Sequence, residues 1–405
     1  MRVLLIHQAA ALRGEPGGTR HIELAMELGK SGDQVVIVTA SRNYLTATAR
    51  AGNAPLPPGV ALVSAYATPG LHRSFLTRAI GFAAFACTSF IAGLRVKDVD
   101  VVWGTSPPIT QAATALMIAR LRRRPFVFEV RDLWPDFAVD LGVLRSGVIV
   151  ALARWLERLL YRRADALIIN SPGFRDHLVA RGADPARVHL VPNGTDVAMF
   201  QPSSRGAALR ATWGARPDDF VVVYAGAHGT ANDLGTVLEA AARLSDRPQV
   251  RLVLIGDGKE KPTLIAAARA RGLDNVQFQP AVAKEAMPDV LAASDACIAI
   301  LRAIPRLATT YPNKVFDYMA AGRPTVLAID GPIRDVIEAC QGGLWVPSGN
   351  AEALAEAVRR LDGGRDEARH MGERARAHVE RQFDRGPITG KLREVLASTL
   401  RTPGR

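Results

Sequence analysis

The amino-acid sequence predicts two α/β domains, each built on a doubly wound parallel sheet covered by helices. Three observations lead to this prediction. Short runs rich in valine, isoleucine and leucine alternate with helical stretches along the chain, as in parallel sheets that are buried on both faces. The alternation pauses in a polar stretch with proline and glycine at 192–206 and then starts again. The 405 residues also exceed what one ordinary hydrophobic core holds.

The first domain begins with the apolar run VLLIH, which a helical stretch follows. Its expected strands lie at 3–7, 34–40, 99–106, 125–132, 164–171 and 188–194. Its expected helices lie at 19–32, 76–95, 109–123, 147–163 and 172–181. Because strands and helices alternate, the expected topology is a doubly wound sheet.

The second domain repeats this pattern from the run DFVVVYAG onward. Its expected strands lie at 219–226, 250–258, 276–280, 296–301, 324–329 and 343–347. Its expected helices lie at 232–244, 260–271, 285–293, 313–321, 333–340 and 350–362. A last helix is expected at about 387–401, outside the second sheet.

The predicted domain boundaries follow from these two sets of elements. We expect an N-terminal domain at 1–195, a C-terminal domain at 196–385, and a helix within 386–405 that packs back on the first domain. Open α/β sheets bind ligands at the carboxyl ends of their strands, so we expect the domains to face each other across a ligand-binding cleft.

Composition narrows the possible partners. The formal net charge of +12 fits an anionic membrane surface or a nucleotide diphosphate. Nucleic acid is not expected, because the chain has neither zinc-finger spacing nor an aromatic–basic RNA signature. The eight histidines show no metal-ligand spacing, so no metal site is predicted. The three cysteines form no C-x-x-C pair and are expected to be buried, which suits a reducing cytoplasm.

Two loops of the first domain carry candidate functional residues. Gly17 and Gly18 precede a helix that starts near Thr19, where a backbone can approach a ligand closely and the helix start favours negative groups. The alternative is a plain loop in which Thr19 caps the helix.

Charged residues also cluster at the end of a buried strand, in the segment FEVRDLWPD. Glu129, Arg131 and Asp132 are candidate catalytic residues, because charges at such a position are costly unless they are paired or used. The alternative for Glu129 and Arg131 is that they pair with each other.

In the second domain, glycines end two strands and are followed by helices. Gly226, Gly256 and Gly258 allow close backbone approach, and Lys261 is positioned to meet a phosphate. Structural turns are the alternative reading of these positions.

The segment TTYPNKVFDYMAAGRPTV carries the strongest candidate site. Asn313 and Lys314 lie at a helix start, where free N–H groups and the helix dipole attract a phosphate. Asp317 follows on the same helix face and can accept hydrogen bonds from ribose hydroxyls. The alternative is a surface ion pair between Lys314 and Asp317.

Taken together and in order, the segments GGTRHIELAMEL, GTSPP, FEVRDLWPD, VPNGTD, IGDGKEK and YPNKVFDYMAAGRPTVL resemble glycosyltransferase family 4. The chain is most similar to the bacterial surface-polysaccharide branch, which includes N-acetylfucosamine transferases. The resemblance implies the GT-B fold of two Rossmann-like domains. It also implies retaining transfer of a sugar from a nucleotide diphosphate sugar, with a UDP-sugar favoured and an N-acetylated amino sugar as one candidate. Neither a metal nor a cofactor is implied.

The resemblance assigns roles residue by residue. Asp317 matches the second acidic residue of the family's E-x7-E element, which holds the donor ribose, whereas Thr309 occupies the first acidic position. Lys314 matches the lysine that meets the diphosphate. The family's basic pair after the first strand of the second domain is missing, and Lys261 and Asn313 are expected to replace it.

Two further positions in the first domain match the family. Gly17 and Gly18 match the glycine loop near the leaving phosphate. Asp132 matches a position beside the sugar that many relatives fill with histidine.

Acceptors in this branch are commonly polyprenyl-diphosphate-linked sugars, which implies a lipid-linked or saccharide acceptor and a peripheral position at the inner face of the cell membrane. The apolar helix at 79–94 and the arginines within 120–124 and 154–163 are the expected membrane contacts; the alternative for 79–94 is a core helix. Two other functions remain open: a nucleotide-sugar 2-epimerase of the same fold, or an inactive nucleotide-binding scaffold subunit.

Overall fold

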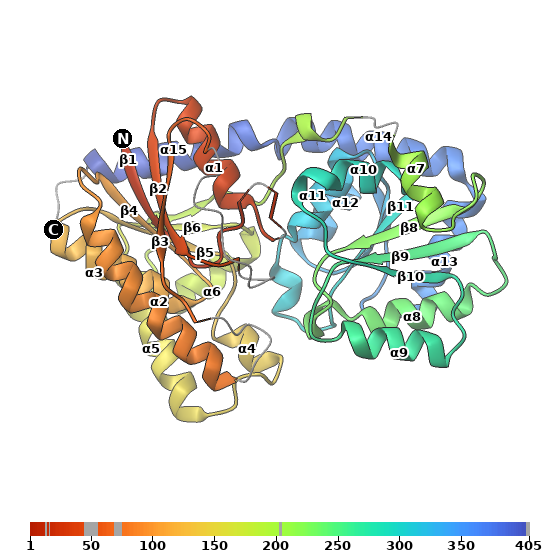
Figure 1. The fold of residues 1–405 in the computed structure, drawn as a ribbon, viewed down its shortest axis with the longest axis horizontal. Coiled ribbons are helices and arrows are strands. Elements are labelled where there is room, and N and C mark those ends of the chain that lie inside the picture. Colours follow the sequence, from red (N-terminus) through yellow and green to blue (C-terminus); the bar gives the residue numbers. More distant parts are fainter. Residues whose placement is uncertain (13, 16, 44–55, 69–74, 202–204, 402–405) are drawn as a thin grey trace. The chain divides into compact units, whose positions relative to one another are not determined.

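A computed structural model describes residues 1–12, 14, 15, 17–43, 56–68, 75–201 and 205–401. The chain forms two compact units (Figure 1). The first unit comprises Met1–Pro192 and the stretch that begins at Arg385, and the second comprises Asn193–Asp384. The chain therefore leaves the first unit inside the polar stretch 192–206 and returns to it for its last helix.

The first unit is a seven-stranded parallel sheet in the order β3-β2-β1-β4-β5-β6-β7. The strands are β1 (Arg2–Ile6), β2 (Gln34–Ala40), β3 (Val60–Ala65), β4 (Val101–Thr105), β5 (Phe126–Val130), β6 (Ala166–Ile169) and β7 (Val188–Leu190). The helices are α1 (Arg20–Lys30), α2 (Phe75–Arg95), α3 (Ile109–Arg122), α4 (Asp136–Asp140), α5 (Gly147–Arg163), α6 (Arg175–Ala180) and α15 (Arg385–Arg401).

The second unit is a six-stranded parallel sheet in the order β10-β9-β8-β11-β12-β13. The strands are β8 (Phe220–Ala225), β9 (Val250–Ile255), β10 (Val276–Gln279), β11 (Ala296–Ile300), β12 (Thr325–Ala328) and β13 (Gly343–Trp345). The helices are α7 (Arg205–Thr212), α8 (Leu234–Arg243), α9 (Lys261–Ala270), α10 (Met287–Ala292), α11 (Asn313–Ala320), α12 (Pro332–Cys340), α13 (Ala351–Gly363) and α14 (Arg365–Gln382). The prediction of two doubly wound parallel sheets is confirmed.

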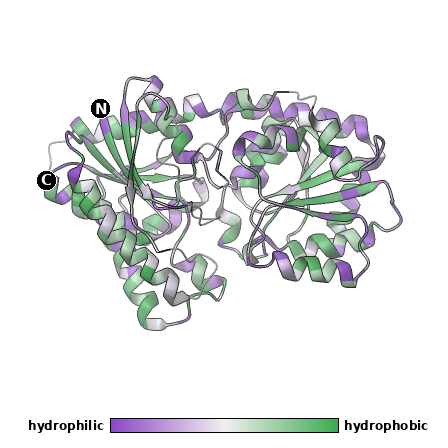
Figure 2. Cartoon of the chain, in the orientation of Figure 1, coloured by the Kyte–Doolittle hydropathy of each residue, from purple (hydrophilic) through white to green (hydrophobic). Residues whose placement is uncertain are grey.

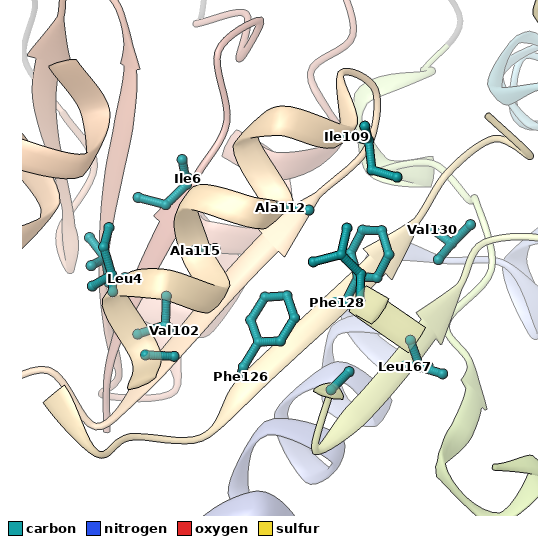
Figure 3. Close-up of a cluster of buried hydrophobic side chains, with 14 of the residues drawn as sticks. Leu4, Ile6, Val102, Ile109, Ala112, Ala115, Phe126, Phe128, Val130 and Leu167 are labelled. Carbon is teal, nitrogen blue, oxygen red and sulfur yellow. The ribbon is translucent and has the colours of Figure 1, made fainter. Parts of the chain in front are cut away.

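The inner strands of each sheet are buried because they are apolar on both sides, whereas edge strands such as β3, β10 and β13 are partly exposed. In Figure 2 most of the strand surface is coloured hydrophobic, while most hydrophilic residues lie on the helices and loops. Figure 3 shows how α3 packs on the first sheet. Gly104 on β4 allows this contact, since a Cβ there would lie 2.7 Å from Cβ of Ala115. Strand residues such as Phe126 and Phe128 then fill the space beside α3.

The structure contains four elements that the sequence analysis does not predict. These are strand β3 and helices α4, α7 and α14. Helix α14 is dominated by charged side chains, and its buried residues recur only every three or four positions, at Ala368, Met371, Gly372, Ala375 and Val379. Such a sparse stripe gives a weak apolar signal even though one face of the helix is buried.

The cysteine prediction is partly wrong. Cys297 is buried, but Cys340 is half-buried and Cys87, on α2, is exposed. No helix within the described ranges is both long enough and apolar enough to span a membrane.

Candidate functional site

In the first unit, a buried cluster of one carboxylate, one guanidinium and one imidazole lies near the carboxyl end of β5. Glu129, on β5, has no exposed surface. Its Oε1 accepts a hydrogen bond from Nε of Arg20 at 3.0 Å, and its Oε2 lies 2.5 Å from Nε2 of His21. Burial opposes the charge of Glu129, but His21 and Arg20 outweigh this effect and hold its pKa well below the usual range. Glu129 therefore pairs with two residues of α1 and not with Arg131.

Arg20 also binds the segment that leads out of the first unit. Its Nη1 donates to the carbonyl of Pro192 and its Nη2 to that of Val191, both at 2.8 Å. One turn further along α1, the carboxylate of Glu23 accepts a hydrogen bond from Nε of Arg385 at 3.0 Å. The first turns of α1 thus hold the chain both where it leaves this unit and where it returns.

Arg131 and Asp132 follow β5 directly. Nη1 of Arg131 lies 3.1 Å from Nε2 of His7. Oδ1 of Asp132 is buried and has no hydrogen-bond partner among the described residues. Burial raises the pKa of Asp132 to about 6, although the charge of Arg131 opposes this shift. A carboxyl group that titrates near neutral pH and has an unpartnered oxygen is a candidate for contact with substrate.

The glycine loop before α1 is exposed at Gly17 and Gly18. Gly17 has a φ of 138°, in the region that favours glycine. A Cβ at Gly18 would meet no atom within 4 Å, so internal packing does not require a glycine there. Thr19 is buried, and its hydroxyl donates to the carboxylate of Glu23 instead of capping the backbone of α1. Thr19 therefore occupies the N-cap position of α1, as the alternative expects, but its side chain makes no cap hydrogen bond to the helix backbone.

In the second unit, the start of α11 meets the end of β8. Nζ of Lys314 donates to the hydroxyl of Tyr224 at 2.8 Å and lies 4.0 Å from the centre of its ring. Gly226 makes room for this arrangement, because a Cβ there would lie 2.5 Å from the same Nζ. Burial lowers the pKa of Lys314 to about 7. A half-buried lysine at a helix start, with no carboxylate partner in the described part of the chain, is suited to an anion.

Asn313 is the exposed first residue of α11. The residue before it is Pro312, which offers no side-chain cap to the first N–H groups of the helix. These N–H groups therefore add to the anion-binding character of the position.

Asp317 lies on α11 and is buried, with 9% of its surface exposed. Its Oδ1 accepts hydrogen bonds from the hydroxyl of Thr195 at 2.7 Å and from Nζ of Lys284 at 2.5 Å. The alternative of an ion pair between Lys314 and Asp317 is therefore wrong. Sequence reasoning missed Thr195 and Lys284; the only signal for Lys284 was a lysine shortly after a predicted strand.

The glycine loops of the second unit pack against each other. A Cβ at Gly256 would lie 1.8 Å from the carbonyl oxygen of Gly226, and a Cβ at Gly258 would lie 2.4 Å from that of His228. Both positions also have positive φ angles, 148° and 159°. Close loop packing thus accounts for these two glycines.

Lys261 is not free to meet a phosphate in this structure. Its Nζ donates to the carbonyls of Gly256 and Gln279, each at 2.7 Å, and so fastens the loop after β9 to the end of β10. Thr309, at the usual acidic position, donates its hydroxyl to the carbonyl of Arg306 within a turn. Of the expected phosphate contacts, Lys314 and the start of α11 remain available.

Within the described residues, no group of three or more His, Cys, Asp and Glu side chains is placed to hold a metal ion.

Comparison with known families agrees with this architecture. Residues 17–194 match the glycosyl transferase 4-like domain, and residues 219–362 match the glycosyl transferases group 1 domain. The chain belongs to glycosyltransferase family 4. Its two Rossmann-like units are those of a GT-B glycosyltransferase.

Named relatives and solved structures support the same conclusion. The chain is 27% identical over 326 residues to WcaI of Escherichia coli K12, which is named as a colanic acid biosynthesis glycosyl transferase. The match covers 76% of this chain and 79% of that protein. It is 31% identical over 212 residues to the D-inositol 3-phosphate glycosyltransferase of Mycobacteroides abscessus, a match that spans 51% of this chain and 46% of the relative.

Among solved structures, Anabaena Alr3699/HepE, crystallised in complex with UDP and glucose, is similar with a TM-score of 0.74 and 19% identity, covering 98% of this chain and all of that one. Sucrose-phosphate synthase from Thermosynechococcus elongatus has a TM-score of 0.75 and 20% identity, and the match covers 98% of both chains. At these identities the similarity concerns the fold.

The buried cluster yields a prediction about stability. Glu129→Gln keeps the shape of the side chain but leaves the guanidinium of Arg20 buried without a negative partner. We expect this change to lower the free energy of unfolding by about 3–5 kcal/mol, as measured by urea denaturation. Glu27→Gln, which breaks a surface pair with Lys30, is the matched control and should cost less than about 1 kcal/mol. Equal costs for the two variants would contradict the role given to Glu129.

Proposed function

We propose that this glycosyltransferase moves a sugar, with retention of configuration and without a metal, from a nucleotide diphosphate sugar to an acceptor in cell-surface polysaccharide synthesis. A UDP-sugar is the favoured donor, and an N-acetylated amino sugar is one candidate for the transferred group. The relative WcaI carries a polysaccharide-synthesis name, and the similar HepE structure contains UDP and glucose, which supports this choice.

The observation that carries the donor assignment is the environment of Lys314. This half-buried lysine lies beside Tyr224 at the start of a helix, and its amine has no carboxylate partner among the described residues. A leaving nucleoside diphosphate develops negative charge, which this amine and the first N–H groups of α11 would stabilise. In this proposal these groups take the place of a metal ion.

Asp317 and Asp132 take the remaining roles in the proposal. Oδ1 of Asp317 is fixed by Thr195 and Lys284, so the carboxylate is held in one orientation with Oδ2 left for the ribose hydroxyls. Asp132, largely ionised at neutral pH, would bind the transferred sugar and stabilise positive charge that develops on its ring.

The proposed acceptor is lipid-linked, with a polyprenyl diphosphate carrier, or a free saccharide. A lipid-linked acceptor would place the enzyme at the inner face of the cell membrane, as a peripheral protein. The two alternatives stay testable: a 2-epimerase would convert the donor without an acceptor, and an inactive scaffold would bind nucleotide without turnover.

The donor site can be tested by calorimetry with UDP and GDP. We expect one of the two to bind, and Lys314→Met to weaken that binding by at least about tenfold, because a charged hydrogen-bond donor to the phosphate is lost. The exposed Lys391 on α15 provides the control Lys391→Met, which should bind as the wild type does. A folded wild-type protein that binds neither nucleotide would overturn the donor assignment.

The same site predicts a dependence on pH. The charged amine is the form that attracts a diphosphate, and its pKa in the free protein is about 7. A bound diphosphate raises this pKa, so binding takes up a proton above pH 7, and affinity should fall by up to about tenfold per pH unit as pH rises. UDP-glucose is the suitable ligand because its phosphates do not titrate in this range. Lys314→Met should abolish the dependence; an unchanged profile in that variant would show that another group titrates.

Asp132 can be tested by turnover. Asp132→Asn should lower kcat by at least about a hundredfold while leaving UDP affinity within a few-fold of the wild-type value, because the change affects the sugar and not the nucleotide. Asp140→Asn, on the exposed end of α4, is the matched control. Analysis of the sugar products with and without acceptor separates transfer from 2-epimerisation, and binding without any turnover in the wild type would favour the scaffold.

A further inference from the structure

The second unit contains a pocket that the proposed donor site does not use. Helices α10, α11 and α14, which surround it, share one hydrophobic core on the second sheet (Figure 1). The pocket has a volume of about 370 Å³, a size that suits a small molecule and excludes a macromolecule. Its lining includes Phe200, Gln201, Ala292, Ala321, Arg323 and Arg376. We call it the arginine pocket.

The arginine pocket lies at the amino ends of the strands, away from the proposed diphosphate site. Ala292 ends α10 shortly before β11 begins, and Arg323 comes shortly before β12. Lys314 lies in the first turn of α11, whereas Ala321 follows the last residue of that helix. The eight residues of α11 span about 12 Å. The pocket and the diphosphate site are therefore two separate places at opposite ends of one helix.

Arg323 contributes a guanidinium that the protein leaves partly unpaired. Its Nε is buried and has no hydrogen-bond partner among the described residues, while its Nη2 donates to the carbonyl of Ala292 at 3.2 Å. Arg323 forms no ion pair within the described part of the chain, because the nearby Asp295 is bound by Arg210 at 2.9 Å. Burial lowers the pKa of Arg323, so its surroundings do not fully stabilise its charge.

Arg376 brings a second guanidinium to the same pocket. Its Nη1 donates to the carbonyls of Phe200 and Ala320, which fix the group in place. Its Nε donates to Glu380 at 2.9 Å, but that side chain is exposed, so water screens the pair. Nη2 of Arg376 makes no hydrogen bond to a described residue. One N–H group of each arginine is thus left without a protein acceptor.

The rest of the described lining carries no opposing charge. Phe200, Ala292 and Ala321 form apolar walls, and Gln201 adds a neutral amide. No acidic side chain among the described residues lines the pocket. Two positive groups around one cavity repel each other, and an anion between them would remove this repulsion.

We propose that the arginine pocket binds the phosphate group of a small molecule. Arg323 would donate to the phosphate from the fork of its Nε and an Nη atom, and Nη2 of Arg376 would add a further hydrogen bond. A sugar phosphate and free phosphate share this chemistry, and the apolar walls would contact the organic part of the former. This site is independent of the donor assignment, since it uses none of the same residues.

Calorimetry with glucose 6-phosphate, inorganic phosphate and glucose tests the site. At about pH 8 a phosphate group carries two negative charges, whereas Lys314, with a pKa of about 7, is mostly neutral. We expect glucose 6-phosphate to bind and glucose not to bind. Weaker binding of inorganic phosphate than of glucose 6-phosphate would identify a phosphorylated organic ligand, and equal binding would identify free phosphate.

Two substitutions in the pocket and one control locate the bound phosphate. Arg323→Gln should weaken binding by at least about tenfold, because hydrogen bonds between charged groups are lost. Ala292→Leu should weaken it by a similar factor, because the larger side chain fills the pocket while both arginines remain. Arg269→Gln removes an exposed arginine of α9 and should bind as the wild type does. All three variants should keep the wild-type thermal midpoint.

Three results would overturn the site. The first is a folded wild-type protein that binds neither glucose 6-phosphate nor inorganic phosphate. The second is equal binding by the wild type, Arg323→Gln and Ala292→Leu. The third is phosphate binding that Lys314→Met abolishes, which would place the ligand at the start of α11. Failure to bind UDP with phosphate binding intact would overturn the donor assignment alone.

Discussion

The buried cluster of Glu129, Arg20 and His21 is the constraint around which the first unit is organised. A carboxylate near the carboxyl end of the buried strand β5 is tolerated only because α1 brings two nitrogen donors to it. The same arginine then binds the carbonyls at 191 and 192, where β7 has ended and the chain leaves the unit. Helix α1, strand β5 and the segment that leaves the unit are thereby held together by one set of hydrogen bonds. The exposed glycine loop that starts α1 is held by the same helix.

The fold could be predicted because strands of parallel sheets are continuously apolar, and this signal does not depend on distant residues. The partners in the candidate site could not be predicted in the same way. The sequence suggests the neighbour Arg131 as an ion-pair partner for Glu129, but its partner in the structure, Arg20, lies 109 positions away. The sequence likewise suggests an ion pair between Lys314 and Asp317, but Asp317 binds Thr195, which lies 122 positions away. Sequence spacing describes neighbours on one element, whereas these partners come from different elements that tertiary packing brings together.

Two lysines of the second unit show how local chemistry separates a structural from a ligand-binding role. Both lie in the first turn of a helix, Lys261 in α9 and Lys314 in α11, as an anion-binding lysine often does. The amine of Lys261 is satisfied by two backbone carbonyls, and this contact joins two loops. The amine of Lys314 has a phenol and an aromatic ring beside it, and burial shifts its titration toward neutral pH. Only the second lysine gains from a bound anion, because the anion would supply the charge that its surroundings lack.

The order of the chain has a consequence for how the protein is made. The second unit is one continuous segment whose two ends lie side by side, since Thr195 and Asp384 form a bridge. The first unit is made of two segments, because α15 packs on α1 after the whole second unit has been synthesised. On the ribosome, domains generally fold in the order in which they emerge. Here the unit that emerges first is completed last. Until α15 is made, the surface of α1 that α15 covers stays exposed to the cell and its chaperones.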